Sequence, residues 1–229
     1  MDIRFIGHAT VELTEGDTNV LIDPFLAPKN PVATVTAEEV EPTHILITHG
    51  HADHTADFLR VAERTGAHVV SMVEISRWHA AKGHEERSEI NIGGTARFDW
   101  GWVKMVQAFH TNTLEGEGGI MVGPPAGLVV NIGGKTVYHL GDTGLFGDLK
   151  LIAESTPVDV ALIPIGGNYT MDRHDGVTAA KLIGADTVIP IHYDTFPPIE
   201  TDAEAYKADV ESQTSLKVVI LAPGETFTP

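Results

Sequence analysis

The sequence contains no cysteine, and this absence removes two kinds of stabilising element. Without cysteine the chain can form no disulfide, and no metal site in it can use a thiolate ligand. Long apolar runs are missing as well. No segment reaches the roughly 18 apolar residues of a membrane span, and residues 1–6 hold no apolar core of an export signal. We therefore expect a cytoplasmic protein with no membrane partner.

Basic residues are scarce. The chain has 15 Lys and Arg against 32 Asp and Glu, which gives a net charge of −17 with histidine neutral. Nucleic-acid binding draws on clustered Lys and Arg that displace counterions from phosphates, and the sequence has no such run. Nucleic acid is therefore not an expected partner, and the acidic surplus is explained by solubility.

Apolar patterning predicts short strands first and strand–helix alternation afterwards. The predicted strands are residues 3–6, 10–13, 20–22, 44–48, 67–72, 158–163, 187–191 and 216–221. The predicted helices are residues 36–39, 53–64, 74–82, 175–183 and 202–211. No linker divides the 229 residues, so we expect one domain, residues 1–229, with two sheets inside and helices outside.

Two Gly-Gly pairs predict hairpin turns. Gly93-Gly94 lies in the strand-rich stretch 90–109, and Gly133-Gly134 separates the apolar runs 128–132 and 135–140. Each hairpin would place its two strands side by side in one sheet.

Metal-type residues follow several of the apolar strands. They are His49-Gly50-His51, Asp53-His54, His110, Asp142 and His192. Strand ends feed the loops at one rim of a sheet, where sites are commonly built. A two-metal site needs nitrogen and oxygen ligands from separate elements and a carboxylate that bridges the cations.

The spacing within residues 49–54 favours ligation over a structural role. His49 and His51 are two residues apart, so both rings project to one side of an extended chain. Asp53 and His54 begin the predicted helix, where a carboxylate interacts well with the helix dipole. A single histidine beside a strand is usually structural, but three histidines and one aspartate within six residues indicate a metal site.

The run Thr-His-Gly-His-Ala-Asp-His at residues 48–54 resembles the signature of the metallo-β-lactamase superfamily. Later landmarks of that superfamily recur in order at His110, in Gly-Asp-Thr at 141–143, and at His192. Within the superfamily the chain resembles the UPF0173 metal-dependent hydrolase group and, more distantly, ascorbate-6-phosphate lactonases. Residues 7–10, 23–25 and 164–171 support the UPF0173 resemblance. The resemblance implies an α/β fold, a four-layer αββα sandwich of two mixed sheets between outer helices.

The resemblance also implies a site for two divalent metal ions, and every ligand position of the family is matched. The implied ligands are His49, His51 and His110 for the first metal, Asp53, His54 and His192 for the second, and Asp142 as the bridge between them. Nitrogen and oxygen ligands suit zinc, manganese, iron or nickel. Zinc is our first choice and manganese the second.

Two such metals would share a hydroxide that attacks a carbonyl or phosphoryl centre. We therefore expect a hydrolase of a small-molecule ester, lactone, amide or phosphoester, with Asp53 orienting the hydroxide. The alternatives are a phosphodiesterase or nuclease and, in a different class, a non-catalytic metal-binding protein. A homo-oligomer is left open.

Three further places carry weaker signals. His8 is predicted to act in catalysis as a proton donor or substrate contact, with a core or rim role as the alternative. His139 either donates a hydrogen bond to a metal ligand or is simply buried. Asn168, Tyr169 and Thr170 either line the mouth of the site or form a turn that requires Gly and Asn.

Replacing the implied bridge tests the two-metal assignment. Asp142→Asn keeps the shape of the side chain but removes the charge that would hold two cations together. We expect a strong loss of both metal content, measured by elemental analysis, and hydrolytic activity. Full activity with two metals retained would rule out the bridging role.

Overall fold

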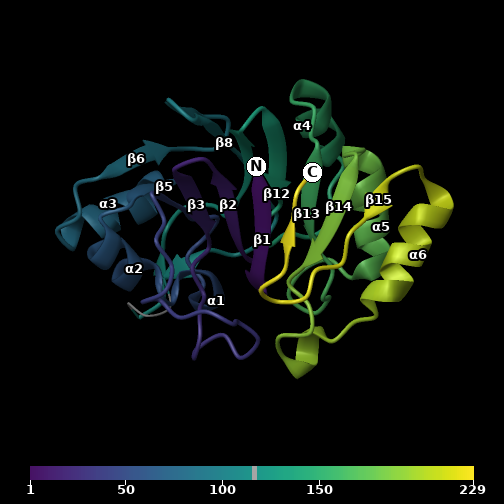
Figure 1. Cartoon of the computed structure of the whole chain (residues 1–229), viewed down its shortest axis with the longest axis horizontal. Coiled ribbons are helices and arrows are strands. Elements are labelled where there is room, and N and C mark those ends of the chain that lie inside the picture. The colour runs from purple at the N-terminus through teal and green to yellow at the C-terminus, as the bar shows by residue number, and fades with distance from the viewer. Residues whose placement is uncertain (115–117) are drawn as a thin grey trace.

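The computed structural model describes residues 1–114 and 118–229, and its strands form two large mixed sheets that lie against each other (Figure 1). In the first sheet, strands from β16 to β3 are antiparallel neighbours, and those from β3 to β6 are parallel. Its strands, in spatial order, are β16 (Thr226–Phe227), β1 (Asp2–Gly7), β2 (Thr10–Glu15), β3 (Thr18–Ile22), β4 (His44–Leu46), β5 (His68–Met72) and β6 (Arg87–Ile90).

The second sheet has the same mixed character, with parallel strands from β15 to β12 and antiparallel strands beyond. Its strands, in spatial order, are β15 (Lys217–Val218), β14 (Thr187–Ile191), β13 (Val160–Pro164), β12 (Lys135–His139), β11 (Ala126–Ile132), β8 (Gly101–Gln107) and β7 (Thr95–Phe98). A separate pair is formed by β9 (Thr113–Leu114) and β10 (Ile120–Met121).

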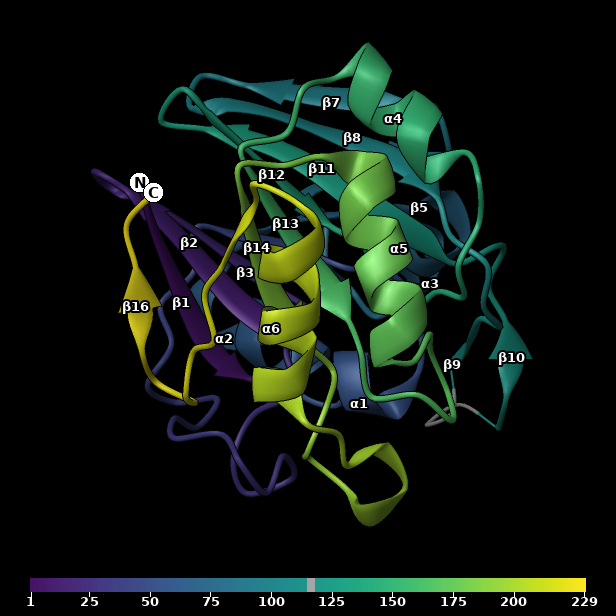
Figure 2. The ribbon, with the colours of Figure 1, turned by 90° about the vertical axis from the view of Figure 1, so that its right-hand side faces the viewer.

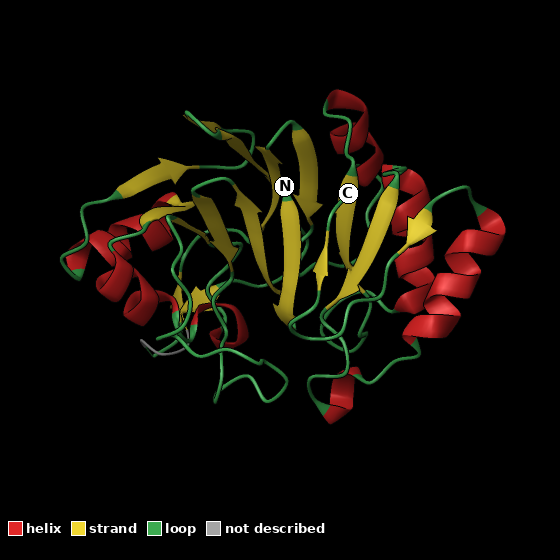
Figure 3. Ribbon diagram, viewed as in Figure 1, coloured by secondary structure: helices red, strands yellow, loops and turns green. Residues whose placement is uncertain are grey.

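Helices cover the outer faces of both sheets (Figures 1, 2 and 3). The helices on the side of the first sheet are α1 (Ala52–Thr55), α2 (Phe58–Thr65) and α3 (Val73–Ala81). Those on the side of the second are α4 (Leu149–Ser155), α5 (Arg173–Ile183) and α6 (Ala203–Gln213). The predicted four-layer αββα sandwich is confirmed. None of the helices in the described ranges has the length and apolar character that a bilayer crossing requires.

The main core lies between the sheets and follows the two-residue period of the strands. Val103 and Met105 of β8 and Leu128 and Val130 of β11 alternate into this layer, and all four are fully buried. Burying one such side chain contributes roughly 1.5–3 kcal/mol. Strands β13 and β14 are buried along their whole length, because α5 and α6 cover their other face. Their continuous apolar sequence follows from this double burial.

Two predicted helices differ from the structure. The helix expected over residues 53–64 is divided into α1 and α2, because the chain leaves helical geometry at Asp57. No helix forms over residues 36–39, although the Glu39 carboxylate accepts the Thr36 N–H as in a capping box; it also accepts the Thr36 hydroxyl. Pro42 follows shortly, and the residue before a proline disfavours helical backbone.

The Gly-Gly pairs had different outcomes. Gly133-Gly134 turns the chain between β11 and β12, as predicted. The hairpin predicted at Gly93-Gly94 is wrong, because β6 and β7 lie in different sheets and this pair carries the chain from one to the other. The strand predicted over residues 216–221 pairs with β14 only at Lys217–Val218.

A histidine of the first sheet contacts the second sheet where β7 turns into β8. His44 of β4 accepts a hydrogen bond at Nε2 from the Trp100 indole N–H at 3.0 Å, and its ring packs edge-on against Phe98 and Trp100. Burial, together with the neighbouring charge of His68, lowers the pKa of His44 to about 4. The neutral ring is required, because protonated Nε2 cannot accept the indole proton.

This contact should make stability fall as the solution is acidified. Between pH 6.5 and 4 the unfolded chain protonates at residue 44 and the folded chain does not, so the free energy of unfolding decreases as the pH falls. His44→Gln keeps an acceptor but cannot titrate. We expect its loss of unfolding free energy between pH 7 and 4.5 to be about 1–2 kcal/mol smaller than in the wild type, after discounting for partial exposure. Urea unfolding at each pH measures this, and identical pH slopes would contradict it.

Candidate metal centre

All seven predicted ligands come together at one rim of the sandwich, drawn from both sheets. Each one follows a strand. His49, His51, Asp53 and His54 come after β4, His110 after β8, Asp142 after β12 and His192 after β14. Five of them border a cavity of about 620 Å³, namely His51, Asp53, His110, Asp142 and His192.

Asp142 lies at the centre of the arrangement. Its Oδ2 is 3.0 Å from His192 Nε2 and 3.5 Å from His110 Nε2. Its Oδ1 is 3.2 Å from His54 Nε2. One buried carboxylate therefore faces histidines on both sides, which is the position a bridging ligand would occupy.

Three histidines form a first cluster on one side of Asp142. His49 Nε2 lies 3.0 Å from His51 Nδ1, and His110 Nε2 lies 3.3 Å from the same atom. One nitrogen from each ring lies within 4.8 Å of one from each of the others. Ring nitrogens that face each other this closely need a shared proton or a cation between them. The geometry suits a single metal ion.

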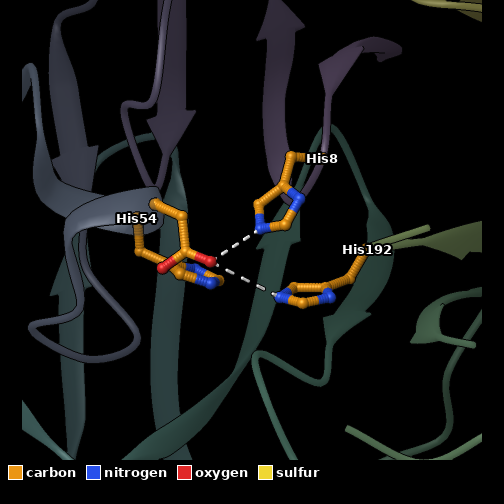
Figure 4. Close-up of side chains that lie close together, drawn as sticks. His8, His54 and His192 are labelled. Atoms are coloured by element: carbon orange, nitrogen blue, oxygen red, sulfur yellow. Dashed lines mark hydrogen bonds and ion pairs between the residues drawn. The ribbon is translucent and has the colours of Figure 1, made fainter. Parts of the chain in front are cut away.

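Asp53, His54 and His192 form a second cluster, and His8 joins it (Figure 4). His8 Nε2 is 3.0 Å and His192 Nε2 is 3.9 Å from Asp53 Oδ2, the two contacts marked by dashed lines in Figure 4. Burial, with the nearby positive charge of His192, lowers the pKa of His8 to about 4, so its ring is neutral at pH 7. His8 therefore donates to Asp53 from Nε2, and its Nδ1 accepts from the Thr195 hydroxyl at 2.9 Å.

A residue that we had not predicted as part of the site, Asp23, orients both clusters. It follows β3 and is completely buried. It accepts the backbone N–H of Thr48 at 2.8 Å, the Thr48 hydroxyl at 2.6 Å and His54 Nδ1 at 2.8 Å. Since the Thr48 hydroxyl donates to Asp23, it accepts from His49 Nδ1 at 3.0 Å. Both rings thereby turn Nε2 toward the cluster, the tautomer that a metal ligand needs.

The sequence did carry a signal for Asp23. Like His192, it stands directly after a buried strand. Its role could not be read from spacing, because its partners Thr48 and His54 lie beyond an intervening loop.

The charges of the site favour cations. Burial alone would lower the pKa of His54, but the carboxylates of Asp142 and Asp23 hold it well above its usual value. Burial would raise the pKa of Asp142, but His192 and His54 hold it well below. The proton drawn to His54 is one that a divalent cation would displace.

Several buried ligand atoms have no hydrogen-bond partner among the described residues. They are His54 Nε2, Asp142 Oδ1, and both ring nitrogens of His192. His54 Nε2 and Asp142 Oδ1 face each other at 3.2 Å, and His192 Nε2 faces Asp142 Oδ2 at 3.0 Å, as ion-pair contacts that lack a hydrogen bond. Buried polar atoms are nearly always hydrogen-bonded, so converging atoms without such a bond indicate a missing ligand. The residues present therefore fit metal ions.

The backbone around the site is strained. His8, Asp23 and His192 all have positive φ, at 61°, 50° and 55°, a conformation that costs of order 1–3 kcal/mol per non-glycine residue. The His192 N–H also donates to the His8 carbonyl at 2.7 Å. Gly50 has no space for a side chain, since a Cβ would lie 2.8 Å from the Thr113 carbonyl oxygen.

Two buried side chains hold the loops of the site. His139 makes no hydrogen bond to a metal ligand in the described structure. Its Nε2 donates to the Ala9 carbonyl at 2.8 Å and its Nδ1 accepts the Gly141 N–H at 3.0 Å, which ties the sheets together beside Asp142. Asn112, which we did not predict, accepts the Gly50 N–H at 2.7 Å.

The loop over residues 168–170 satisfies both interpretations. Tyr169 borders the cavity and is 58% exposed, so the loop does reach the mouth of the site. Asn168 has φ of 54°, so the turn also needs a residue tolerant of that conformation. Asn168 and Thr170 are not among the residues that border the cavity.

The sequence is similar to known metal-dependent hydrolases along its whole length. A family model described as the beta-lactamase superfamily domain matches residues 18–193. A UPF0173 metal-dependent hydrolase of Pelotomaculum thermopropionicum is 44% identical over 229 residues, covering 99% of each chain, and one of Methanopyrus kandleri is 43% identical with the same coverage. The chain belongs to the UPF0173 metal-dependent hydrolase family.

A solved structure supports the same placement. Igni18, a metallo hydrolase of the archaeon Ignicoccus hospitalis, superposes with a TM-score of 0.90 at 36% identity, over 99% of this chain and 97% of the other. This UPF0173 chain is therefore a metal-dependent hydrolase of the β-lactamase superfamily, with candidate metal-binding groups of histidine and aspartate.

Asp23→Asn should weaken metal binding without a direct ligand being changed. An amide NH₂ placed against His54 Nδ1 would force the proton onto Nε2, the nitrogen that faces Asp142. We expect metal affinity to fall by roughly 10- to 100-fold, measured by competition with a chromophoric zinc chelator.

Asp159→Asn is the matched control. Asp159, like Asp23, accepts a backbone N–H, that of Thr136 at 2.8 Å, but it lies outside the site. Its affinity should equal that of the wild type. Equal affinities in both variants would contradict the orienting role of Asp23.

Proposed function

We propose that the protein is a dinuclear enzyme that hydrolyses a small-molecule ester, lactone, amide or phosphoester. The observation that carries this proposal is the position of Asp142, whose two oxygens face histidines of both clusters within 3.5 Å. His49, His51 and His110 would hold one metal and Asp53, His54 and His192 the other. Zinc is our first choice, with manganese, iron and nickel also suited to these ligands.

When bound, a pair of divalent cations lowers the pKa of a shared water and stabilises negative charge on the substrate oxygen. The protein residues prepare that chemistry. Burial opposes the charge of Asp53, but His54 and the hydrogen bond from His8 outweigh it and hold the pKa of Asp53 below its usual range. Asp53 therefore stays ionised and can accept a hydrogen bond from the attacking water. This hydrogen bond would orient the water.

His8 contributes as a positioning residue in this proposal. Its ring is completely buried and stands between Asp53 and Thr195. A neutral donor at Nε2 fixes Asp53 Oδ2, and Asp53 borders the cavity. Since the pKa of His8 is about 4, donation of a proton to a leaving group is not expected of it at neutral pH.

A small substrate suits the cavity better than a nucleic acid. Its volume of about 620 Å³ lies in the range of small-molecule sites. Lys29 is the one Lys or Arg among the lining residues that the structure describes, and it is paired with Asp57. The net charge of −17 also repels polyanions. A phosphodiesterase remains the alternative, and a cytoplasmic location and a homo-oligomer remain expectations.

Metal add-back tests the proposal. Metal-depleted protein would be assayed on p-nitrophenyl esters, lactones and bis-p-nitrophenyl phosphate while zinc or manganese is titrated in. We expect activity to reach its maximum at two metal ions per chain, with esters or lactones preferred. A clear preference for the phosphodiester would favour the alternative, and no turnover with metals bound would favour a non-catalytic protein.

A pair of histidine variants separates the site from general effects of mutation. His51→Ala should lose at least one metal ion and about 100-fold or more in kcat, because an oriented ligand is removed. His174→Ala changes a histidine of α5 that is outside both clusters, and it should keep the metal content and activity of the wild type. Equal activity of the two variants would contradict the assignment.

A further inference from the structure

The cavity beside the metal centre has two chemically different sides. Around the first cluster it is polar, with His51, His110 and the hydroxyl of Thr111, which lies 3.4 Å from His51 Nε2. Another part of the lining carries no polar side-chain atoms. We call this part the apolar wall, and it consists of Phe25, Phe196, Pro198 and Ile199.

The apolar wall lies next to the second cluster. The rings of Phe25 and Phe196 are 6.3 Å apart between centroids, and each meets the ring of His8 edge-on, at 5.7 and 5.8 Å. The His8 ring in turn lies 4.0 Å from that of His192 and bonds to Asp53. A group that rests on the wall is therefore beside Asp53 and His192, one ring away from the reacting atoms.

Hydrogen bonds fix the first loop of the wall, the one that carries Phe25. Asp57 is 2% exposed and accepts the Leu26 N–H at 2.9 Å and Lys29 Nζ at 2.7 Å. The Asp57 N–H itself donates to the Pro24 carbonyl at 3.0 Å instead of to a carbonyl of α1, and this is where α1 and α2 divide. The break in the helix therefore serves to hold a wall of the cavity.

The second loop, which carries Phe196 and Ile199, is held in a similar way. The Asp194 N–H donates to the Ile199 carbonyl at 3.0 Å, and Asp194 Oδ1 accepts the Thr201 N–H at 2.9 Å. Ile199 itself is fully buried behind the cavity surface. A wall that is already ordered loses little conformational entropy when a ligand packs on it.

The wall also offers no net charge. Lys29 stands beside it, but its ammonium group is neutralised by Asp57 at 2.7 Å and bonded to the Ala56 carbonyl. A charged substituent placed here would lose its hydration and gain no counter-ion. An uncharged apolar group would instead gain about 25 cal/mol for each Å² removed from water.

We propose that the substrate carries an uncharged apolar substituent, a short alkyl chain or a single ring, that packs on Phe25, Phe196 and Pro198, with Ile199 behind them. Its scissile centre then faces Asp53 and Asp142, and its polar end points toward His51 and His110. This inference rests on the proposed hydrolytic function and narrows its substrate to hydrophobic esters or lactones.

Two substrate series test the proposal on the metal-loaded enzyme. Methyl esters from acetate to hexanoate, and γ-lactones with tails of increasing length, extend the apolar group one methylene at a time. We expect kcat/KM to rise about three- to fourfold per methylene until the wall is covered. Monomethyl succinate, which ends in a carboxylate, should react at least tenfold more slowly than methyl valerate.

The variant Phe196→Ala assigns the effect to the wall. It should reduce the gain per methylene to twofold or less, whereas Phe196→Leu should keep an intermediate gain. Phe227→Ala is the matched control, because Phe227 is a half-buried ring that packs on the core from β16 and does not line this cavity. It should keep the full gain.

The outcomes separate this inference from the proposed function. Turnover with no dependence on chain length, or faster turnover of monomethyl succinate, overturns the apolar substituent and leaves the hydrolase intact. If no ester or lactone is turned over, binding of benzyl alcohol to the metal-depleted protein tests the apolar wall. Chemical shifts of the backbone amides measure this binding. Shifts confined to residues 25–29 and 193–199, and lost in Phe196→Ala, support the wall, and their absence overturns it.

Discussion

The buried carboxylate of Asp23 is the contact on which the metal centre depends. Because β3 and β4 pair in parallel with Ile22 opposite Leu46, the residues after each strand meet at the same edge. Asp23 there receives three hydrogen bonds from Thr48 and His54, which a fully buried charge requires. Two rings take their orientation from it, His54 directly and His49 through Thr48. The register of β3 and β4 thus also sets the tautomers of His49 and His54.

The second sheet supplies the remaining candidate ligands. Near the rim, hydrogen bonds join it to the first sheet. His139 reaches across to the Ala9 carbonyl, and the His192 N–H reaches the His8 carbonyl. Both partners belong to the turn between β1 and β2, which also presents His8 to Asp53. The strained backbone at His8 and His192 is tolerated because these bonds over-determine it. Rigid elements of this kind hold catalytic groups more accurately than free loops do.

Sequence patterns revealed the parts of the molecule that are local. The layer order was predicted, because alternating and continuous apolar runs record which strand faces are buried. The seven candidate ligands, which the structure brings together, were predicted from the dense spacing of residues 49–54, from their place after strands and from the family resemblance. The features that were not predicted depend on contacts between residues that are far apart in the chain. The helix is divided at Asp57 because its N–H bonds to the Pro24 carbonyl, Gly93-Gly94 crosses between sheets, and Asp23 acts through Thr48.

The division of the ligands between the two sheets has a consequence for biosynthesis. The ribosome releases His49 to His54 early, together with Asp23, and this segment alone holds only part of each cluster. His110, Asp142 and His192 emerge later. A nascent chain therefore completes neither candidate cluster until strands of the second sheet have been synthesised. A metal ion held by ligands from both sheets would bind only after the two sheets have packed together.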